Sequence, residues 1–228
     1  MTILCFDYGH GGSDGGACYN GRKESNDVLS LGKAVAAEMR RHGVTVDETR
    51  TSDTTVSLTD RSDFENKKKY DYFIAFHRNA FQPEKANGVE TFTYLNGSSQ
   101  AKSLANKVQT SLVPIGFSNR EVKEANFHVL RETHAAAILI EVGFIDNTND
   151  NKIFDTKRND IIKAITKAIL AQCGVNYVDK VAPAVKPPVV VADKTYRVVT
   201  GSFTDRENAD KRVAELKKLG FESFLVVK

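Results

Sequence analysis

The sequence predicts an α/β fold with a mostly parallel central sheet flanked by helices, followed by a small C-terminal βαβ unit. Up to about Val175, short apolar runs alternate with stretches of helical periodicity. Two of the runs, 72–76 (YFIAF) and 136–140 (AAILI), are apolar throughout, as is typical of strands covered on both faces. Strands interleaved with helices favour a largely parallel sheet.

Each element follows from a local pattern. A first strand is expected at 2–6, and then a helix in which four apolar residues share one face: Val28, Leu31, Val35 and Met39. Gly43 is expected to end this helix in the C′ position. The other predicted elements are strands at 44–46, 72–76, 88–95 and 136–140, and helices at 57–68, 98–113 and 149–173.

The chain is expected to divide into a main domain at 1–176, a proline- and valine-rich linker at 177–194 and a small unit at 195–228. That unit is predicted as a strand at 196–203, a helix that starts with a Thr204–Glu207 capping box and ends at Gly220, and a strand at 221–227. So small a unit seldom folds alone, and a two-stranded sheet leaves open edges. A second copy of the chain is therefore the expected partner, giving a homodimer.

The composition is that of an ordinary globular protein. Hydrophobic residues make up 41% and charged residues 27%, and the formal net charge is +3. Such a balance does not indicate a nucleic-acid partner, and there is no aromatic pattern of the RNA-binding kind. Cys5, Cys18 and Cys173 are odd in number and lack a CxxC spacing, which argues against a disulfide framework or a thiolate metal site. No signal peptide and no membrane-spanning segment are expected.

Three polar side chains stand directly after apolar strands. His10 follows the strand at 2–6, His77 follows the run that ends at 76, and Glu141 ends the run at 138–140. In open α/β sheets, ligands bind outside the carboxyl ends of the strands, so these residues converge if the strands are parallel. Two histidines and a carboxylate are the usual ligands of a catalytic zinc ion that keeps one position open.

The spacing alone leaves the third ligand open. Glu24, at the start of the first helix, and Glu141 are both candidates, and the one that does not bind the metal would act as general base on the attacking water. His42 lies in the last turn of a helix, where a cation suits the dipole, and is interpreted as structural. His128 and His134 flank the loop before Glu141 and are not the favoured ligands.

At these residues the sequence resembles the zinc-dependent N-acetylmuramoyl-L-alanine amidases of the amidase-type-3 family, over roughly residues 2–173. The motifs that carry the resemblance are DYGHGG at 7–12, Glu24, LxxR at 58–61, HRN at 77–79, NFHVLR at 126–131 and LIEVGF at 139–144. The resemblance implies that His10, Glu24 and His77 bind zinc and that Glu141 is the catalytic glutamate.

Other residues refine this expectation. Asn79 and Arg131 are expected to hold the substrate or to support the metal ligands. The sequence departs from the family at Tyr8 and Ala136, where proline is usual, and at Phe76, where a smaller residue is common. These departures put local loop geometry in doubt and leave every proposed ligand in place. The tail resembles half of a SPOR domain, a module that binds peptidoglycan glycan strands.

The expected function is hydrolysis of the amide between N-acetylmuramic acid and L-alanine in bacterial peptidoglycan, with Zn²⁺ as cofactor. The alternatives are a zinc peptidase that acts within the stem peptide and a non-catalytic wall-binding protein. In lacking a visible signal peptide, the sequence is similar to phage endolysins and to amidases that lyse the mother cell after sporulation. This similarity predicts a cytoplasmic location until lysis, followed by action on the wall.

Overall fold

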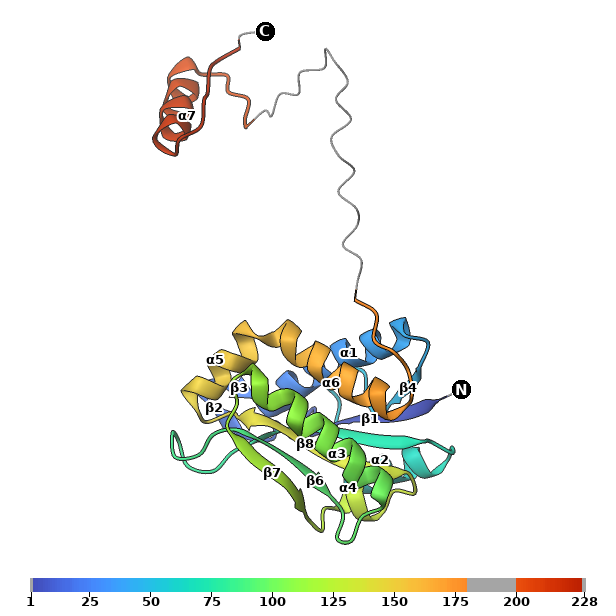
Figure 1. Ribbon diagram of the computed structural model, residues 1–228. Coiled ribbons are helices and arrows are strands. Elements are labelled where there is room, and N and C mark those ends of the chain that lie inside the picture. Colours follow the sequence, from blue (N-terminus) through green and yellow to red (C-terminus); the bar gives the residue numbers. More distant parts are fainter. Residues whose placement is uncertain (1, 180–199, 227–228) are drawn as a thin grey trace. The chain divides into compact units, whose positions relative to one another are not determined.

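The computed structural model describes residues 2–179 and 200–226 of the chain. The chain divides into two compact units, Met1–Asp179 and Lys180–Lys228. The first unit is built on a six-stranded sheet in the order β4-β1-β5-β8-β6-β7, and a separate two-stranded ribbon pairs β2 with β3 (Figure 1).

The strands of the first unit are β1 (Ile3–Tyr8), β2 (Cys18–Tyr19), β3 (Arg22–Lys23), β4 (Thr45–Glu48), β5 (Tyr72–Asn79), β6 (Val89–Thr93), β7 (Asn119–Glu124) and β8 (Ala136–Phe144). Its helices are α1 (Glu24–Arg41), α2 (Leu58–Asn66), α3 (Ser99–Leu112), the 3-10 turn η1 (Val113–Ile115), α4 (His128–Arg131), α5 (Thr148–Thr156) and α6 (Arg158–Gln172).

The central sheet is mostly parallel, which confirms the predicted fold class. β1 pairs in parallel with both β4 and β5, and β5 pairs in parallel with β8. β6 runs antiparallel to β8, and β7 is parallel to β6, so these two strands at one edge run against the other four. The carboxyl ends of β1, β5 and β8 therefore lie together at one edge of the sheet.

Helix α1 follows the predicted pattern closely. Its apolar stripe of Val28, Leu31, Val35 and Met39 is buried, because that side of the helix faces the sheet. The helix ends where glycine was expected to end it, since Gly43 follows the C-cap with a positive φ of 78°. The first residue of α1 is Glu24, so the helix places this carboxylate at the rim of the sheet.

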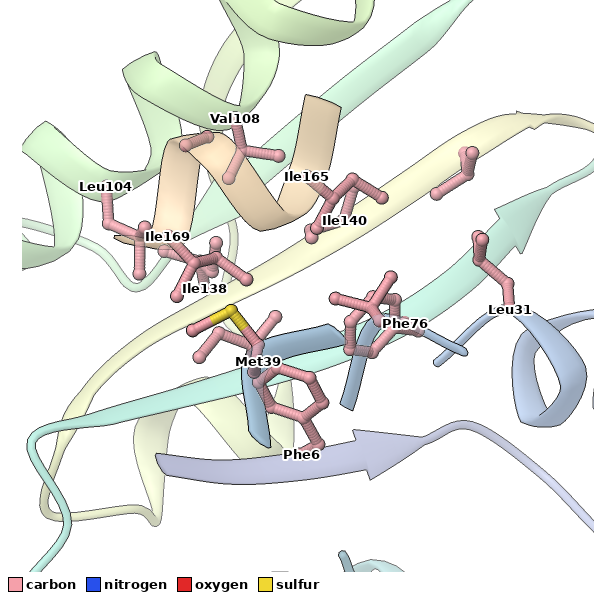
Figure 2. Packing of buried hydrophobic residues seen from close by; sticks show 14 of the residues in the cluster. Phe6, Leu31, Met39, Phe76, Leu104, Val108, Ile138, Ile140, Ile165 and Ile169 are labelled. Carbon is pink, nitrogen blue, oxygen red and sulfur yellow. The ribbon is translucent and has the colours of Figure 1, made fainter. Parts of the chain in front are cut away.

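Helices cover both faces of the sheet. The larger core lies between α1, α3 and α6 and the even-numbered side chains of β1, β5 and β8, among them Phe6, Phe76 and Ile138 (Figure 2). The smaller core lies on the other face, where Val129 and Leu130 of α4 pack against odd-numbered strand residues. Each fully buried side chain of this size contributes about 1.5–3 kcal/mol.

The predicted single helix at 149–173 is wrong. The structure has two helices, α5 and α6, which meet at Lys157, and this residue has a non-helical φ of −108° and ψ of 19°. The six residues at 155–160 are all polar and interrupt the apolar stripe. Asp155 binds Arg22 through two hydrogen bonds of 2.9 and 2.7 Å, and such tertiary contacts fix the break where the periodicity is weakest.

Residues 200–226 of the second unit form one helix, α7 (Arg206–Lys218), and none of them is in a strand. The strand expected at 221–227 is therefore not formed over its described residues, 221–226. The strand expected at 196–203 is not formed over 200–203, and its other half, 196–199, lies outside the described residues. The predicted capping box is also wrong, because Asp205 caps the helix by accepting from the backbone N–H groups of Glu207 and Asn208. A lone two-stranded sheet is at best marginally stable in water, which is consistent with the lack of strand structure at 200–203 and 221–226.

The first unit continues to Asp179, three residues beyond the boundary predicted at 176. Tyr177 packs against the larger core, and its ring centre is 4.8 Å from that of His42. Residues 180–194 of the predicted linker lie outside the described residues. Over the described ranges, no helix has both the length and the apolar character that crossing a membrane requires.

Candidate metal and catalytic site

Three of the predicted residues come together at the carboxyl edge of the sheet. His10, Glu24 and His77 each offer one ligand atom, and these atoms all lie within 4.8 Å of one another. Glu24 lies between the histidines: its Oε2 is 3.2 Å from His10 Nε2, and its Oε1 is 2.9 Å from His77 Nδ1. Among residues 2–179 and 200–226, no other group of three or more His, Cys, Asp or Glu side chains has this geometry.

Backbone groups hold the Glu24 carboxylate in this position. Oε2 accepts from the N–H of Ala17 at 2.9 Å, and Oε1 accepts from the N–H of Arg78 at 3.0 Å. Because Glu24 is also the first residue of α1, the partial positive charge of the helix N-terminus favours its ionised form. The position at the start of a helix that the sequence predicts for Glu24 is therefore the position found in the structure.

Two glycines allow the imidazole rings to approach the backbone. A Cβ on Gly9 would lie 2.2 Å from His77 Cε1, and a Cβ on Gly16 would lie 2.6 Å from His10 Cδ2 and 2.7 Å from Glu24 Oε2. Gly16 also has a positive φ of 66°, a backbone conformation that residues other than glycine rarely adopt. His10 itself has a φ of 61°, so the loop after β1 is held in a sparsely populated conformation at the site.

Two buried arginines brace that loop. Arg61 donates to Tyr8 O at 2.7 Å and to His10 O at 2.8 Å, and it pairs with Asp7 at 2.7 Å. Arg50 donates to Tyr8 O at 2.7 Å and to Gly9 O at 2.8 Å. These contacts satisfy backbone carbonyls at the end of β1 and offset the cost of the unusual backbone conformation. The LxxR motif at 58–61 therefore acts through the backbone of the His10 loop.

His10 has a second carboxylate partner, Asp14. Its Nδ1 is 2.8 Å from Asp14 Oδ2, which leaves Nε2 directed at Glu24. A carboxylate that accepts from one imidazole nitrogen fixes the ring and leaves the other nitrogen available as a ligand. Asp14 was not among the residues predicted from the sequence. The available signal was its spacing of four residues from His10 within a glycine-rich loop.

The electrostatics of the cluster favour positive charge next to Glu24. Burial lowers the pKa of His10, but hydrogen bonds and charge from Glu24 and Asp14 raise it to about 9. Burial and Glu24 oppose each other in the same way at His77, whose pKa is raised. Burial raises the pKa of Glu24, yet the two histidines hold it well below its usual range. A divalent cation would replace the two protons.

Glu141 stands beside the cluster and is not one of its members. It pairs in register with His77 on the neighbouring strand, so the two side chains share a face of the sheet. Its Oε2 is buried and has no hydrogen-bond partner among the described residues. Burial and the charges of Glu24 and Glu90 raise its pKa to about 7, against a lowering effect of His77. Such a carboxylate can take up and release a proton near neutral pH.

The donor set fits a metal ion. Two imidazoles and one carboxylate are ligand types that a divalent transition metal takes, and three protein ligands are the number typical of catalytic zinc sites. The orphaned carboxylate oxygen of Glu141 next to this cluster is the kind of group that a bound water would satisfy. Of the two carboxylates that the spacing had left open, the structure groups Glu24 with the histidines.

The remaining candidate residues make other contacts. Asn79 donates to Glu90, and Arg131 contacts Asn126 and Glu132 at 2.6 Å each. His128 Nε2 is 3.2 Å from Ser62 Oγ, and the backbone N–H of His134 donates to Glu65 at 2.9 Å. His42 contacts the backbone carbonyl of Glu38 through Nδ1 at 2.8 Å, as suits a structural role. All three cysteines are free.

The fold and this site together define an α/β enzyme domain with a candidate metal centre at the carboxyl edge of its sheet. Residues 4–171 match the N-acetylmuramoyl-L-alanine amidase family, and the chain belongs to that family. Residues 176–227 match the SPOR domain, a longer stretch than the unit predicted at 195–228.

Relatives along the whole chain are amidases by name. The chain is 32% identical to the N-acetylmuramoyl-L-alanine amidase CwlM of Bacillus licheniformis, with 99% of this chain and 85% of that protein covered. It is 30% identical to the sporulation-specific N-acetylmuramoyl-L-alanine amidase of Bacillus subtilis, with 100% and 86% covered.

Solved structures agree over the first unit. The catalytic domain of CwlV, an N-acetylmuramoyl-L-alanine amidase of Paenibacillus polymyxa, has a TM-score of 0.72 and 28% identity, with 77% of this chain and 100% of that chain covered. An N-acetylmuramoyl-L-alanine amidase of Clostridium difficile 630 has a TM-score of 0.72 and 30% identity, with 76% and 97% covered.

Proposed function

We propose that this chain is a zinc-dependent amidase that hydrolyses the bond between N-acetylmuramic acid and the L-alanine of the peptidoglycan stem peptide. Membership of the N-acetylmuramoyl-L-alanine amidase family and full-length similarity to named amidases support the reaction. The observation that carries the chemistry concerns Glu141, which is in register with His77 of the His10–Glu24–His77 cluster: its buried Oε2 has no hydrogen-bond partner among the described residues.

His10, Glu24 and His77 would hold the zinc ion. When bound there, zinc acts as a Lewis acid toward a carbonyl oxygen and lowers the pKa of water. Glu141 accepts the proton of the water that attacks the lactyl carbonyl carbon, and returns it to the L-alanine nitrogen as the carbon–nitrogen bond breaks. Because its pKa lies near 7, Glu141 suits both the acceptance and the return of this proton.

The second unit is proposed to bind the cell wall and to pair with a second copy of the chain. The SPOR match supports the first role. Exposed apolar side chains in this unit, Phe221, Phe224 and Val226, support the second, because a unit this small gains a core by pairing. Light scattering should give a dimer for the full chain and a monomer for residues 1–179. A monomeric mass for the full chain as well would refute the pairing.

Analysis of digested peptidoglycan tests the function. An amidase releases intact stem peptides that begin with free L-alanine and leaves glycan strands with free lactyl carboxyls. A stem-peptide peptidase would instead release shorter peptides and leave L-alanine attached to muramic acid, and a non-catalytic wall-binding protein would release nothing. Mass spectrometry of the products separates the three, and loss of release on chelation with recovery on added zinc would support the metal. The predicted location before lysis stays a prediction, which cell fractionation can test.

A further inference from the structure

A row of polar side chains crosses the sheet beside the catalytic site. His77 on β5 pairs in register with Glu141 on β8, and Glu141 pairs in register with Glu90 on β6. Directly opposite residues on neighbouring strands point to the same face of a sheet, with Cβ atoms about 4.5–5.5 Å apart. The row therefore begins at the His10–Glu24–His77 cluster and continues past Glu141 toward the edge strand β7.

Glu90 is the centre of a small ionic network at the far end of this row. Its side chain is nearly completely buried, and its carboxylate accepts from Arg120 Nε at 3.2 Å, from Lys123 Nζ and from the Asn79 amide. One carboxylate thus faces two cations, which leaves a net positive charge. The side chains of Arg120 and Lys123 remain 35% and 42% exposed, so this charge is open to a ligand.

A register shift in the backbone places Arg120 opposite Glu90. The register between β6 and β7 shifts between Val89 and Thr91, so that two residues of β7, Arg120 and Glu121, stand opposite Glu90. Bulges of this kind occur next to active sites and redirect side chains. The Arg120 guanidinium also lies over the buried Phe144 ring, 4.9 Å from its centre. Within the described residues, its two terminal nitrogens have no hydrogen-bond partner.

The chemistry of the proposed substrate says which part would meet these cations. In peptidoglycan the N-acetylated sugars are uncharged, and the lactyl carboxyl of muramic acid is consumed in the scissile amide. The stem peptide, by contrast, carries free carboxylates on its side chains and end. An arginine with two free terminal nitrogens recognises a carboxylate through paired hydrogen bonds.

We propose that Arg120 and Lys123 form a subsite for a carboxylate of the stem peptide. This subsite lies at the far end of the row, beyond Glu141 as seen from the His10–Glu24–His77 cluster. The inference rests on the proposed function and adds the side on which the peptide binds. Strands are about 4.8 Å apart, so β7 lies about 10 Å from Glu141. An extended peptide spans at most about 3.5 Å per residue, so the second or third residue of the stem reaches this distance.

Kinetics on synthetic muramoyl peptides test the subsite with the full chain. Four fragments with amidated C-termini would carry isoglutamate or isoglutamine as the second residue, combined with diaminopimelate or lysine as the third. Each would be assayed with the unaltered chain and with Arg120→Gln and Lys123→Gln. Either single variant keeps one cation on Glu90, which protects the fold. Lys102→Gln is the matched control, because Lys102 pairs with Glu124 of the same strand from α3, on the opposite face.

The expected result is a preference of the unaltered chain for one carboxylate over its neutral counterpart. Both variants should raise KM about tenfold on the carboxylate fragments only, with kcat nearly constant, since a charge-assisted hydrogen bond is worth about 1.5–3 kcal/mol. If the variants raise KM only on the two fragments that carry isoglutamate, the bound carboxylate belongs to the second residue. If they raise KM only on the two fragments that carry diaminopimelate, it belongs to the third.

Equal effects of the variants on all four fragments, or effects no larger than those of Lys102→Gln, would overturn the subsite while leaving the amidase function intact. Failure of the unaltered, zinc-loaded chain to hydrolyse any fragment would instead overturn the proposed function, and the subsite with it. Thermal unfolding of each variant shows whether a loss of activity reflects a loss of folded protein.

Discussion

Burial of the Glu141 carboxyl links its proposed catalytic role to the stability of the fold. The folded protein raises the pKa of this carboxyl from 4.5 to about 7, chiefly through desolvation. Between these values the folded state therefore holds a proton that the unfolded chain has released. By linkage, the contribution of Glu141 to stability is most favourable below pH 4.5 and declines as the pH rises to about 7. Above that pH the metal-free fold carries a buried charge, at a cost of at most about 3 kcal/mol.

Glu141→Gln should remove both the catalytic proton transfer and this cost. We expect turnover to fall by a factor of about 10²–10⁴, because a positioned general acid–base is lost, while bound zinc stays at one equivalent. We also expect the metal-free variant to unfold at a higher temperature than the unaltered metal-free chain at pH 8, and at a similar temperature at pH 4.5. Activity assays, metal analysis and unfolding of chelator-treated protein measure these effects.

Asp63→Asn is a suitable control, since Asp63 is exposed on α2. It should change neither activity nor the pH dependence of unfolding. Substantial residual turnover of Glu141→Gln would contradict the proton-transfer role. An unfolding temperature at pH 8 no higher than that of the unaltered chain would contradict the assigned cost of burial.

Asp14 is expected to tune the metal site through His10. In Asp14→Asn the amide can still accept from Gly16 N–H through Oδ1, but its nitrogen cannot accept from His10 Nδ1. Supporting carboxylates of this kind contribute 10- to 100-fold to metal affinity. Because the Asp14 side chain is 61% exposed, we expect about a tenfold loss in zinc affinity, measured by competition with a chromophoric chelator.

The control for Asp14 is Asp53→Asn. Asp53 bonds to the N–H of Gly12 in the same loop at 2.8 Å and does not touch His10. An equal loss of zinc affinity in both variants would show that loop order, and not the His10 contact, determines the effect.

At the residue scale, site residues could be predicted from the sequence where polar side chains recur at the same position, directly after apolar runs. His10, His77 and Glu141 each follow an apolar run of the sequence, and the parallel pairing of β1, β5 and β8 brings the ends of these runs together. Asp14 and Arg50 could not be found in this way, because they contact the His10 side chain and the Gly9 carbonyl from loops whose conformation is not periodic. Asn79 was noticed for its position in a motif, and its actual partner, Glu90, lies on another strand.

At the scale of elements, Gly32 sets the distance between α1 and β1. A Cβ at this position would lie 2.1 Å from Tyr8 Cε1, and the Tyr8 ring is itself held by its hydroxyl bond to Glu48 at 2.8 Å. Gly32→Ala would favour the helix by about 1 kcal/mol through intrinsic propensity. Overpacking against Tyr8 should outweigh this gain and give a net destabilisation of about 1–3 kcal/mol.

The Gly32→Ala variant should also weaken zinc binding, because α1 carries Glu24 two turns earlier on the same rigid helix. Urea unfolding and a zinc titration measure the two effects. Ala37→Gly, on the exposed face of α1, is the comparison: it should cost about 1 kcal/mol through propensity alone and leave zinc affinity unchanged. Stabilisation by Gly32→Ala would disprove the steric argument.

Elements were predictable where burial enforces a period and less so at the edges. α1 and the strands β1, β5 and β8 are buried on at least one side, and their periodicity marks them. β7 was not predicted, because its sequence, NREVKE, has one apolar residue and it lies at the edge of the sheet. The α5–α6 break was missed because the contact that fixes it comes from Arg22, far away in sequence.

At the scale of the whole molecule, the composition of the chain did not reveal where the first unit ends. The linker composition suggested a boundary at 176, but Tyr177 belongs to the first unit. Its ring lies against His42, its hydroxyl donates to Glu38 at 3.1 Å, and the ammonium groups of Lys163 and Lys167 lie 5.5 and 5.1 Å from the ring centre. Composition does not reveal such contacts, because they join α1 and α6 to a single residue beyond both helices.

Tyr177 should therefore stabilise the first unit without affecting the reaction. A chain of residues 1–176 should be less stable than one of residues 1–179 by about 1–2 kcal/mol, from lost cation–π contacts and apolar burial. For a unit of this size, that lowers the unfolding temperature by roughly 2–8 °C. Turnover of a soluble muramoyl peptide at low temperature should be equal, because His42 and Glu24 lie at opposite ends of α1, about 27 Å apart.

Two substitutions in the full chain separate the contributions at Tyr177. Tyr177→Ala should reproduce most of the loss seen on shortening to 176, and Tyr177→Phe, which removes only the hydroxyl bond to Glu38, should cause a smaller one. Differential scanning calorimetry on the four proteins and the unaltered chain gives the comparison. If residues 1–176 and 1–179 unfold at the same temperature, then Tyr177 adds nothing to the fold and the first unit ends where the composition of the chain had placed its boundary.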